Sequence, residues 1–387
     1  MASVSDYSFT ASENKYSLFW DAFGFCSPYS GIYQYASNLA NEFADTQTKP
    51  IPILAKSETP PAFPYVNTVC VAAEQNFISQ KFKILWIKNS FETVRNHLKN
   101  DENPFIFHGL ANMNIPGSSI DESRGSYVLT VHDLIPLLAP RQVSLPYFLQ
   151  FSYLLPRALK KATKVICVSS WTARTIEERY PWSRNKIEVV KNGVSLPKNY
   201  EGKGLGERKN EKSCKILFIS RWEPYKRFEI IDEILKKTKN IHLDLVTDSV
   251  GAKFFQSKRS AYENRIRIYV NLSKEELLEL YIKNDVYVHP SLLEGFCLPA
   301  CDALKYQRPV VYCQGSAVEE VVGPCGLGIS PQASVDEWIN AIEAVKEWKR
   351  QDLFINNLQK HLNLLPSWKD SSLKIKAIYD KIVDGSL

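Results

Sequence analysis

Short apolar runs alternate with amphipathic stretches along most of the chain. This alternation predicts parallel strands connected by helices, the arrangement of an α/β protein. One further strand is expected to end at the Asn-Gly turn within 189–194. In the first half we expect strands at 16–20, 51–54, 105–108, 127–131 and 164–168, and helices at 32–43, 148–161 and 170–180.

Residues 197–213 interrupt this pattern, because they have almost no apolar content and three glycines. Such a segment is typical of an exposed linker. We therefore predict two doubly wound domains, 1–196 and 214–366, with the ligand site in the cleft between them. The second series predicts strands at 215–220, 241–247, 266–270 and 286–289, helices at 228–237 and 274–282, further helices after Pro299, Val318 and Val335, and a terminal helix at 371–383.

The composition narrows the class of protein. With 387 residues, 44% of them hydrophobic and 23% charged, the chain resembles a packed globular protein. No run approaches 18 apolar residues, and Asp6 and Glu13 occur where a signal peptide would be apolar. The eight cysteines are scattered, several within apolar runs, which favours a reducing, cytoplasmic location. The net charge of +6 suits an anionic small substrate or an anionic membrane surface better than nucleic acid.

A basic cluster follows the apolar run at 215–219. Arg221, Lys226 and Arg227 concentrate positive charge where an α/β strand ends, the usual place for a ligand. Arginine offers a planar fork to phosphate oxygens, and lysine offers a point charge. The alternative is a solvated basic turn.

An acidic cluster follows the strand expected at 286–289. Glu294 precedes Gly295 in the loop after His289, and Pro299 suits the first turn of a helix that carries Asp302. The free N–H groups at such a helix start bind phosphate. Alternatively, Glu294 is an ordinary surface acid.

Together the segments SRWEPYKRF and PSLLEGFCLPACD resemble the retaining glycosyltransferases of family four, which have the GT-B fold of two Rossmann-like domains facing across a cleft. The resemblance covers nearly the whole chain. It includes VLTVHDLIPL, VICVSSWTARTI, VVKNGV and the first glycine loop SPYSGIYQY. The pair Ser367 and Trp368 resembles the start of the family's last helix, so 367–387 is expected to cross back toward the N-terminal domain.

The resemblance implies a role for each matching residue. Arg221 and Lys226 match the pair that holds the donor pyrophosphate, and Glu294 matches the carboxylate that contacts the donor sugar. Asp302 matches the acid that usually binds the ribose. The implied catalytic set is Arg221, Lys226, Glu294 and His132; the donor-binding set is Gly31, Arg221, Lys226, Glu294, Gly295, Phe296, Leu298 and Asp302; His108 and His132 are on the acceptor side.

The implied reaction moves a hexose from a nucleotide-diphosphate sugar to a hydroxyl of a glycan or lipid-linked glycan. The chain has no Asp-x-Asp triplet, so we expect no metal and no cofactor, with cations neutralising the leaving group instead. By resemblance alone, front-side attack accounts for retention. VHDLIPL most resembles mannosyltransferases of cell-surface polysaccharides such as lipopolysaccharide, so GDP-mannose is the first donor to consider. The alternatives are a sugar-nucleotide epimerase, a phosphorylase or a non-catalytic binding module.

The chain departs from the family pattern at several positions. Asp302 stands where the family has a longer glutamate, and Cys297 replaces a glycine of the motif EGFG. Glu319 stands where proline is common, and Pro324 where aspartate is common. These departures leave the donor's identity open.

Two weaker signals complete the picture. Residues 79–100 are basic and aromatic, so they form either a helix that faces the core or one that lies on the inner face of an anionic cytoplasmic membrane through Lys81, Lys83, Lys88 and Arg95. Cys297 and Cys301 are four residues apart, which suits buried thiols better than a zinc site.

Overall fold

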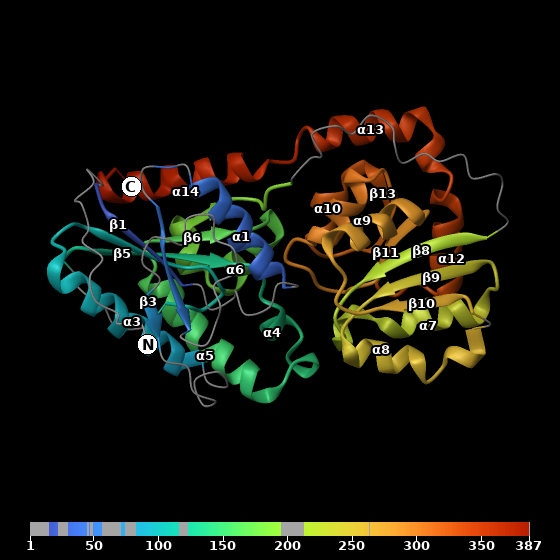
Figure 1. Ribbon diagram of the computed structural model, residues 1–387, viewed down its shortest axis with the longest axis horizontal. Coiled ribbons are helices and arrows are strands. Elements are labelled where there is room, and N and C mark those ends of the chain that lie inside the picture. Colours follow the sequence, from blue (N-terminus) through green and yellow to red (C-terminus); the bar gives the residue numbers. More distant parts are fainter. Residues whose placement is uncertain are drawn as a thin grey trace, which may run out of the picture. The chain divides into compact units, whose positions relative to one another are not determined.

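The computed structural model describes residues 15–21, 30–44, 46, 49–55, 71–73, 83–115, 123–194, 213–262 and 264–386 (Figure 1). The chain forms two compact units. The first unit consists of Met1–Leu137, Ser144–Asn192 and Trp368–Leu387, and the second of Leu138–Val143 and Gly193–Ser367. Of the predicted linker at 197–213, all but Ser213 lies outside the described residues.

The first unit is built on a parallel sheet of seven strands in the order β3-β2-β1-β4-β5-β6-β7. Its strands are β1 (Ser17–Asp21), β2 (Ile51–Ala55), β3 (Val71–Ala73), β4 (Phe105–Gly109), β5 (Gly125–Val131), β6 (Lys164–Cys167) and β7 (Ile187–Val189). Its helices are α1 (Gly31–Phe43), α3 (Lys83–His97), α4 (Ile135–Leu138), α5 (Leu145–Lys161), α6 (Ser170–Arg179) and α14 (Trp368–Val383).

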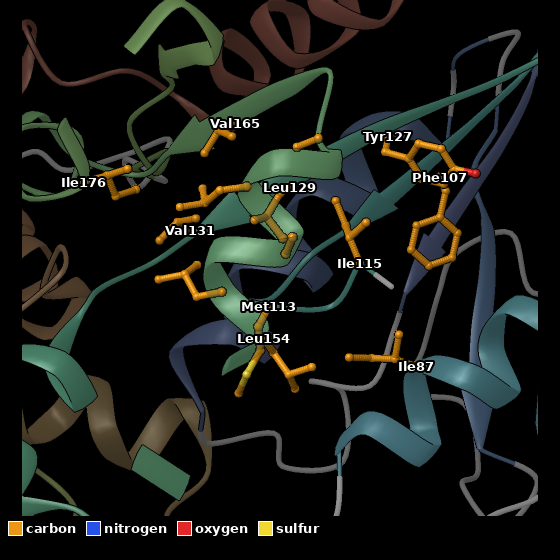
Figure 2. Packing of buried hydrophobic residues seen from close by; sticks show 14 of the residues in the cluster. Ile87, Phe107, Met113, Ile115, Tyr127, Leu129, Val131, Leu154, Val165 and Ile176 are labelled. Carbon is orange, nitrogen blue, oxygen red and sulfur yellow. The ribbon is translucent and has the colours of Figure 1, made fainter. Parts of the chain in front are cut away.

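Alternate strand residues place apolar side chains on both faces of this sheet, as a doubly wound fold requires. One face, with Phe107, Leu129 and Val165, packs against α3, α5 and α6 (Figure 2). The other face carries Trp20, whose ring lies 5.2 Å from that of Phe43 on α1. Each helix therefore buries an apolar stripe against the sheet.

The last helix belongs to the first unit, although it comes after the whole of the second in the sequence. Helix α14 packs beside α1. Its Tyr379 hydroxyl accepts a hydrogen bond from Trp20 Nε1 at 3.2 Å, and Ser371 Oγ donates to Lys191 O at 2.7 Å. These contacts fix α14 to the first sheet.

The second unit repeats the design with six parallel strands in the order β10-β9-β8-β11-β12-β13. Its strands are β8 (Cys214–Ile219), β9 (Ile241–Val246), β10 (Ile266–Tyr269), β11 (Val286–His289), β12 (Val310–Cys313) and β13 (Gly326–Ile329). Its helices are α7 (Phe228–Lys237), α8 (Ser249–Gln256), α9 (Lys274–Lys283), α10 (Leu298–Lys305), α11 (Val318–Val322), α12 (Val335–Val345) and α13 (Asp352–Leu362). The strand order reverses direction between β8 and β11, the position at which such sheets bind ligands.

The two parallel sheets confirm the predicted α/β class. Helix α7 and strand β11 begin and end where the sequence pattern places them. The sequence reasoning did not identify β3, β12, β13, α4, α8 or α13. Among the described residues, no helix is both long and apolar enough to span a bilayer.

Helix α3 is a core-facing helix, which decides between the two interpretations of 79–100. It buries Ile87, Phe91 and Val94 in the core of the first unit. Its exposed Lys88 lies 4.0 Å from Glu92 on the same helix. Lys81 lies outside the described residues. The apolar side that a membrane would need is therefore already occupied.

Candidate active site

The basic cluster forms the turn after β8. Residues Pro224–Lys226 make one turn of 3-10 helix, and Arg227 follows in the left-handed region with φ 55°. Asp248 Oδ2 accepts a hydrogen bond from Trp222 N at 3.3 Å, which ties this turn to the start of α8. Arg221 is exposed to solvent. The turn thus presents the exposed Arg221, the inward-pointing Lys226, and Arg227, whose Nη1 donates to Pro331 O at 3.2 Å.

The acidic cluster forms the loop between β11 and α10. Leu292 N donates to Tyr225 O at 2.9 Å, so this loop is joined to the turn after β8. Glu294 O accepts from Ala317 N at 3.3 Å, which joins the same loop to the start of α11. The two clusters, separate in sequence, therefore form one site at the carboxyl ends of adjacent strands β8 and β11 (Figure 1).

The centre of this site is an ion pair between Lys226 and Glu294. The ammonium contacts Glu294 Oε1, and only 15% of the Lys226 side chain and 11% of the Glu294 side chain are exposed. Burial opposes ionisation of Glu294, but the charge of Lys226 and the hydrogen bonds from His289 and Lys226 outweigh it and hold its pKa well below the usual range. Burial likewise opposes the charge on Lys226, but Glu294 raises its pKa to about 12. Both groups are charged at neutral pH.

His289 and Tyr287 extend this pair into the strand. His289 Nε2 lies 2.6 Å from Glu294 Oε1, and the Tyr287 hydroxyl lies 3.0 Å from His289 Nδ1. A carboxylate can only accept, so Nε2 carries the proton and donates it. Both bonds reach Oε1, and Oε2 of Glu294 accepts no hydrogen bond from the residues that the structure describes. Oε2 is therefore available to a ligand.

The remaining donor-side residues lie around the start of α10. Gly295 and Leu298 are half-buried, and Phe296 is buried with 4% of its surface exposed. Cys297, the residue that replaces a glycine, adopts a left-handed conformation with φ 79°. Asp302 Oδ1 pairs with Lys305 Nζ at 2.5 Å. Asp302 thus already has a cationic partner on its own helix.

Gly31 lies at the first turn of α1 in the first unit. The helix is capped by Ser30, whose Oγ accepts from Tyr33 N at 3.1 Å. A Cβ at Gly31 would meet no described atom within 4 Å. Residues 27–29 of the predicted glycine loop at 27–35 lie outside the described residues. The donor-binding role of Gly31 therefore stays a prediction.

His108 differs from the expected acceptor-side position, because it is a core residue of the first unit. Its side chain is fully buried, with Nδ1 2.5 Å from the Tyr379 hydroxyl and Nε2 2.8 Å from Thr130 Oγ1. Burial, with a smaller effect of His132, lowers its pKa to about 3. The last helix covers this histidine, so direct contact with an acceptor is not supported.

His132 is also mostly buried, but 9% of its surface is exposed. Its Nε2 donates to Leu110 O at 2.8 Å, and its ring lies edge-on to Tyr35 at 4.9 Å. Its neighbour Asp133 supports the loop, since Asp133 Oδ1 accepts from Ile135 N at 3.0 Å. Of the two histidines, only His132 keeps an exposed edge.

Comparison with known proteins gives the family. The family model described as "Glycosyltransferase Family 4" matches residues 29–197, and the model "Glycosyl transferases group 1" matches residues 206–361. Both units are thereby covered, each by its own model. The chain belongs to glycosyltransferase family four and has the GT-B type of fold.

Relatives of this family-four chain include two proteins named as mannosyltransferases. It is 34% identical over 240 residues to the MMP alpha-(1->4)-mannosyltransferase of Mycolicibacterium hassiacum, which is 59% of this chain and 56% of that protein. It is 26% identical over 226 residues to the O-antigen chain mannosyltransferase RfbU of Salmonella typhimurium, 57% of this chain and 60% of that one. The chain spans about half the length of the first curated relatives that it matches.

Among solved structures, Anabaena HepE in complex with UDP-glucose superposes with a TM-score of 0.70. The match covers 94% of this chain and 99% of HepE at 17% sequence identity. At that identity the likeness concerns the fold.

One part of this family-four site has metal-ligand atoms. His289, Glu294 and Cys297 each place such an atom within 4.8 Å of the others. However, ligands that share a tetrahedral zinc ion lie about 3.4 Å apart, whereas His289 Nε2 and Glu294 Oε1 are 2.6 Å apart and joined by a hydrogen bond. The ammonium of Lys226 adds a positive charge beside them. The geometry favours a hydrogen-bonded ion pair over a metal ion.

The sequence reasoning missed Tyr287 and Lys305 and assigned no role to His289. The sequence did contain a signal for a contact between Tyr287 and His289, because alternate residues of one strand point to the same face. Lys305 stands three residues after Asp302 on a helix, a spacing at which side chains meet.

Proposed function

We propose that this protein is a retaining, metal-independent hexosyltransferase that moves a sugar, with mannose from GDP-mannose as the first candidate, to a hydroxyl of a glycan or lipid-linked glycan. The observation that carries the proposal is the buried Lys226–Glu294 ion pair at the reversal point between β8 and β11. The location we propose is the cytoplasm, and the pathway is cell-surface polysaccharide synthesis.

Lys226 and Arg221 would bind the donor's diphosphate. Breaking the sugar–phosphate bond leaves negative charge on the diphosphate, and cations already in position stabilise that charge as it develops. Lys226 is held protonated by Glu294, which raises its pKa to about 12. Arg221 is exposed, so its guanidinium is free to reach a second phosphate. The start of α10, close to Glu294 in sequence, would add backbone N–H groups.

Glu294 would orient the donor sugar through Oε2. Its Oε1 is occupied by Lys226 and His289, so the second oxygen can accept from a sugar hydroxyl. The same two partners lower its basicity, which makes Glu294 a poor nucleophile for a double displacement. This supports front-side attack, in which the leaving phosphate oxygen takes the acceptor's proton. Asp302 would bind the ribose and His132 would lie on the acceptor side.

The choice of mannose rests on relatives. Two of them carry mannosyltransferase in their names, and one of these is an O-antigen chain enzyme. A solved structure with the same fold holds UDP-glucose, so uridine donors belong in any test.

The test is nucleotide release from a panel of GDP- and UDP-sugars by the wild type, Lys226→Ala and Lys360→Ala. Lys360 is an exposed lysine of the same unit, so its variant controls for the loss of one charge. We expect slow hydrolysis of one donor, about 10²–10³-fold slower in Lys226→Ala, and unchanged in Lys360→Ala.

Other outcomes identify other functions. A new sugar nucleotide formed without acceptor would indicate an epimerase, and consumption of inorganic phosphate would indicate a phosphorylase. If calorimetry detects binding of a sugar nucleotide but no nucleotide is released with any acceptor tested, the protein is a binding module. If no nucleotide binds at all, the proposal is wrong.

A further inference from the structure

Helix α5 exposes an apolar stripe to solvent. Leu145, Leu149 and Tyr153 are spaced four residues apart, so they lie along one side of the helix. Their exposed fractions are 66%, 55% and 51%, respectively. Large apolar residues exposed singly are common, but three in successive turns form a continuous patch, which marks an interaction surface.

This stripe is not needed to hold the helix in place. The opposite side of α5 is fully packed against the first sheet through Phe151, Leu154, Leu155, Ala158 and Leu159. The Lys186 ammonium also binds the end of the helix, with Lys160 O at 2.8 Å and Ala162 O at 2.7 Å. Figure 1 shows α5 on the outside of the first unit, beside α3. The exposed side is therefore rigidly displayed.

The same side becomes basic toward the end of the helix. Arg157 follows Tyr153 by four residues and lies over its ring at 3.5 Å. Lys160 lies 5.9 Å from the ring of Trp182, which is 47% exposed. The sequence of α5 contains Arg157, Lys160 and Lys161 and no acidic residue.

We propose that this surface, the α5 face (Leu145, Leu149, Tyr153, Arg157, Lys160 and Trp182), docks on an anionic lipid bilayer. Leucines can insert at the boundary of headgroups and acyl chains, while tyrosine and tryptophan favour the interface itself. Arginine and lysine meet anionic headgroups, and the lack of acidic residues on α5 avoids repulsion from them.

A bilayer fits the face better than a protein partner does. A second copy of this chain would bring its own basic residues against these, because a twofold interface joins the same surface of both copies. The formal net charge of +6 adds to that repulsion and to the attraction of an anionic surface. The α5 face is distinct from the site in the second unit, so membrane binding is measured independently of the proposed transfer reaction.

The test is flotation of the full chain with phosphatidylcholine vesicles, with and without phosphatidylglycerol, at low and physiological salt. We expect recovery with the anionic vesicles to exceed recovery with the neutral ones, and to fall as salt rises. Arg157→Gln combined with Lys160→Gln should weaken partitioning about five-fold per charge, about 25-fold for the pair. The matched control combines Lys369→Gln with Lys374→Gln, two lysines exposed on α14. Its partitioning to anionic vesicles should stay near the wild-type value.

The apolar half is tested in the same way. Leu145→Ser combined with Leu149→Ser should lower partitioning about ten-fold or more. The control combines Leu353→Ser with Leu373→Ser, which are 70% and 55% exposed elsewhere on the chain. Circular dichroism checks that each variant folds, and donor hydrolysis should be unchanged in all of them.

The proposal is wrong if the wild type floats equally with neutral and anionic vesicles, or if both α5 variants bind as their controls do. Light scattering completes the test. One combination of results would assign the α5 face to an interface between copies of the chain and not to a membrane. In it, the wild type self-associates, the Leu145/Leu149 variant is monomeric, and neither protein floats with vesicles.

Discussion

Nε2 of His289 lies 2.6 Å from Oε1 of Glu294, at the end of the central strand β11. Both side chains are nearly buried, with 2% and 9% of their residues' surfaces exposed. Tyr287 lies 3.0 Å from the other ring nitrogen and, with the imidazole neutral, donates to it. His289 therefore orients the carboxylate, and we infer that it is a positioning residue that keeps Oε2 directed at the ligand.

The role of His289 is tested by replacing it with alanine and with glutamine. His289→Ala removes a hydrogen bond to a charged group, so we expect about a ten- to one-hundred-fold lower kcat/KM for donor hydrolysis. Glutamine can still donate to Oε1, so His289→Gln should recover part of that loss. A purely structural role predicts that both variants lose the same stability and that glutamine restores none of the kcat/KM. Thermal unfolding of both variants measures the stability.

The Lys226–Glu294 ion pair makes stability depend on pH in a defined direction. The pKa of Glu294 is lowered from 4.5, so its contribution is present above pH 4.5 and is lost as the pH falls further. The pKa of Lys226 is raised from 10.5 to about 12, so its contribution is present below pH 10.5 and is lost as the pH rises through about 12. The ion pair is complete between these limits.

Lys226→Met should therefore destabilise the protein by about 3 kcal/mol near neutral pH, because it leaves a buried carboxylate without its partner. The difference in unfolding free energy from the wild type should shrink below pH 4.5, where Glu294 of the variant can protonate. Urea unfolding from pH 3.5 to 9 measures this. A difference that stays constant with pH would contradict the assignment, and Lys360→Met serves as the control.

The sequence predicts elements well where local signals agree. Helix α7 has a strong apolar periodicity and follows a turn, and its limits were predicted correctly. The sequence reasoning did not find β12 and β13, and β13 contains two glycines, which are disfavoured in strands. Strand β12 is placed by pairing with β11, and β13 by pairing with β12, and a local pattern does not encode these tertiary contacts.

In the candidate site, too, single residues could be found from the local sequence, but their contacts could not. Lys226 and Glu294 were each identified from their neighbours, but their pairing depends on the adjacency of β8 and β11, which are separated by two strands in the sequence. His108 was assigned to the acceptor side by the family resemblance alone. It is covered by Tyr379, 271 residues later, so only the returning helix α14 reveals that it is a core residue.

Cys297 holds a left-handed backbone conformation, with φ 79°. Residues with a Cβ adopt this conformation at a cost that glycine avoids. Cys297→Gly should therefore be more stable than Cys297→Ala by about 1 kcal/mol, since both remove the buried sulfur and only alanine keeps the strain. Chemical denaturation compares the two variants. The reverse order would show that the left-handed conformation carries no cost here.

Asp302 lies on α10 with Lys305 as its partner. If it binds the ribose of the donor, far from the bond that breaks, Asp302→Asn should raise the donor KM several-fold and change kcat little. Initial rates over a range of donor concentrations separate the two constants. Lys305→Met is the companion variant: it frees Asp302 from its partner and should not raise the KM. A fall in kcat with an unchanged KM in Asp302→Asn would contradict a role in ribose binding.

The hydroxyl of Tyr379 joins the last helix to the first sheet, because it contacts both His108 Nδ1 and Trp20 Nε1. Tyr379→Phe removes this group and leaves two buried polar atoms without their partner. Each such atom costs about 1–3 kcal/mol, so we expect a clear loss in unfolding free energy. Tyr153→Phe is the control, since that ring is 51% exposed on α5. Hydrogen exchange should then show faster exchange along α14 in Tyr379→Phe. If the two variants are equally stable and α14 exchanges as in the wild type, the network around His108 does not anchor the helix.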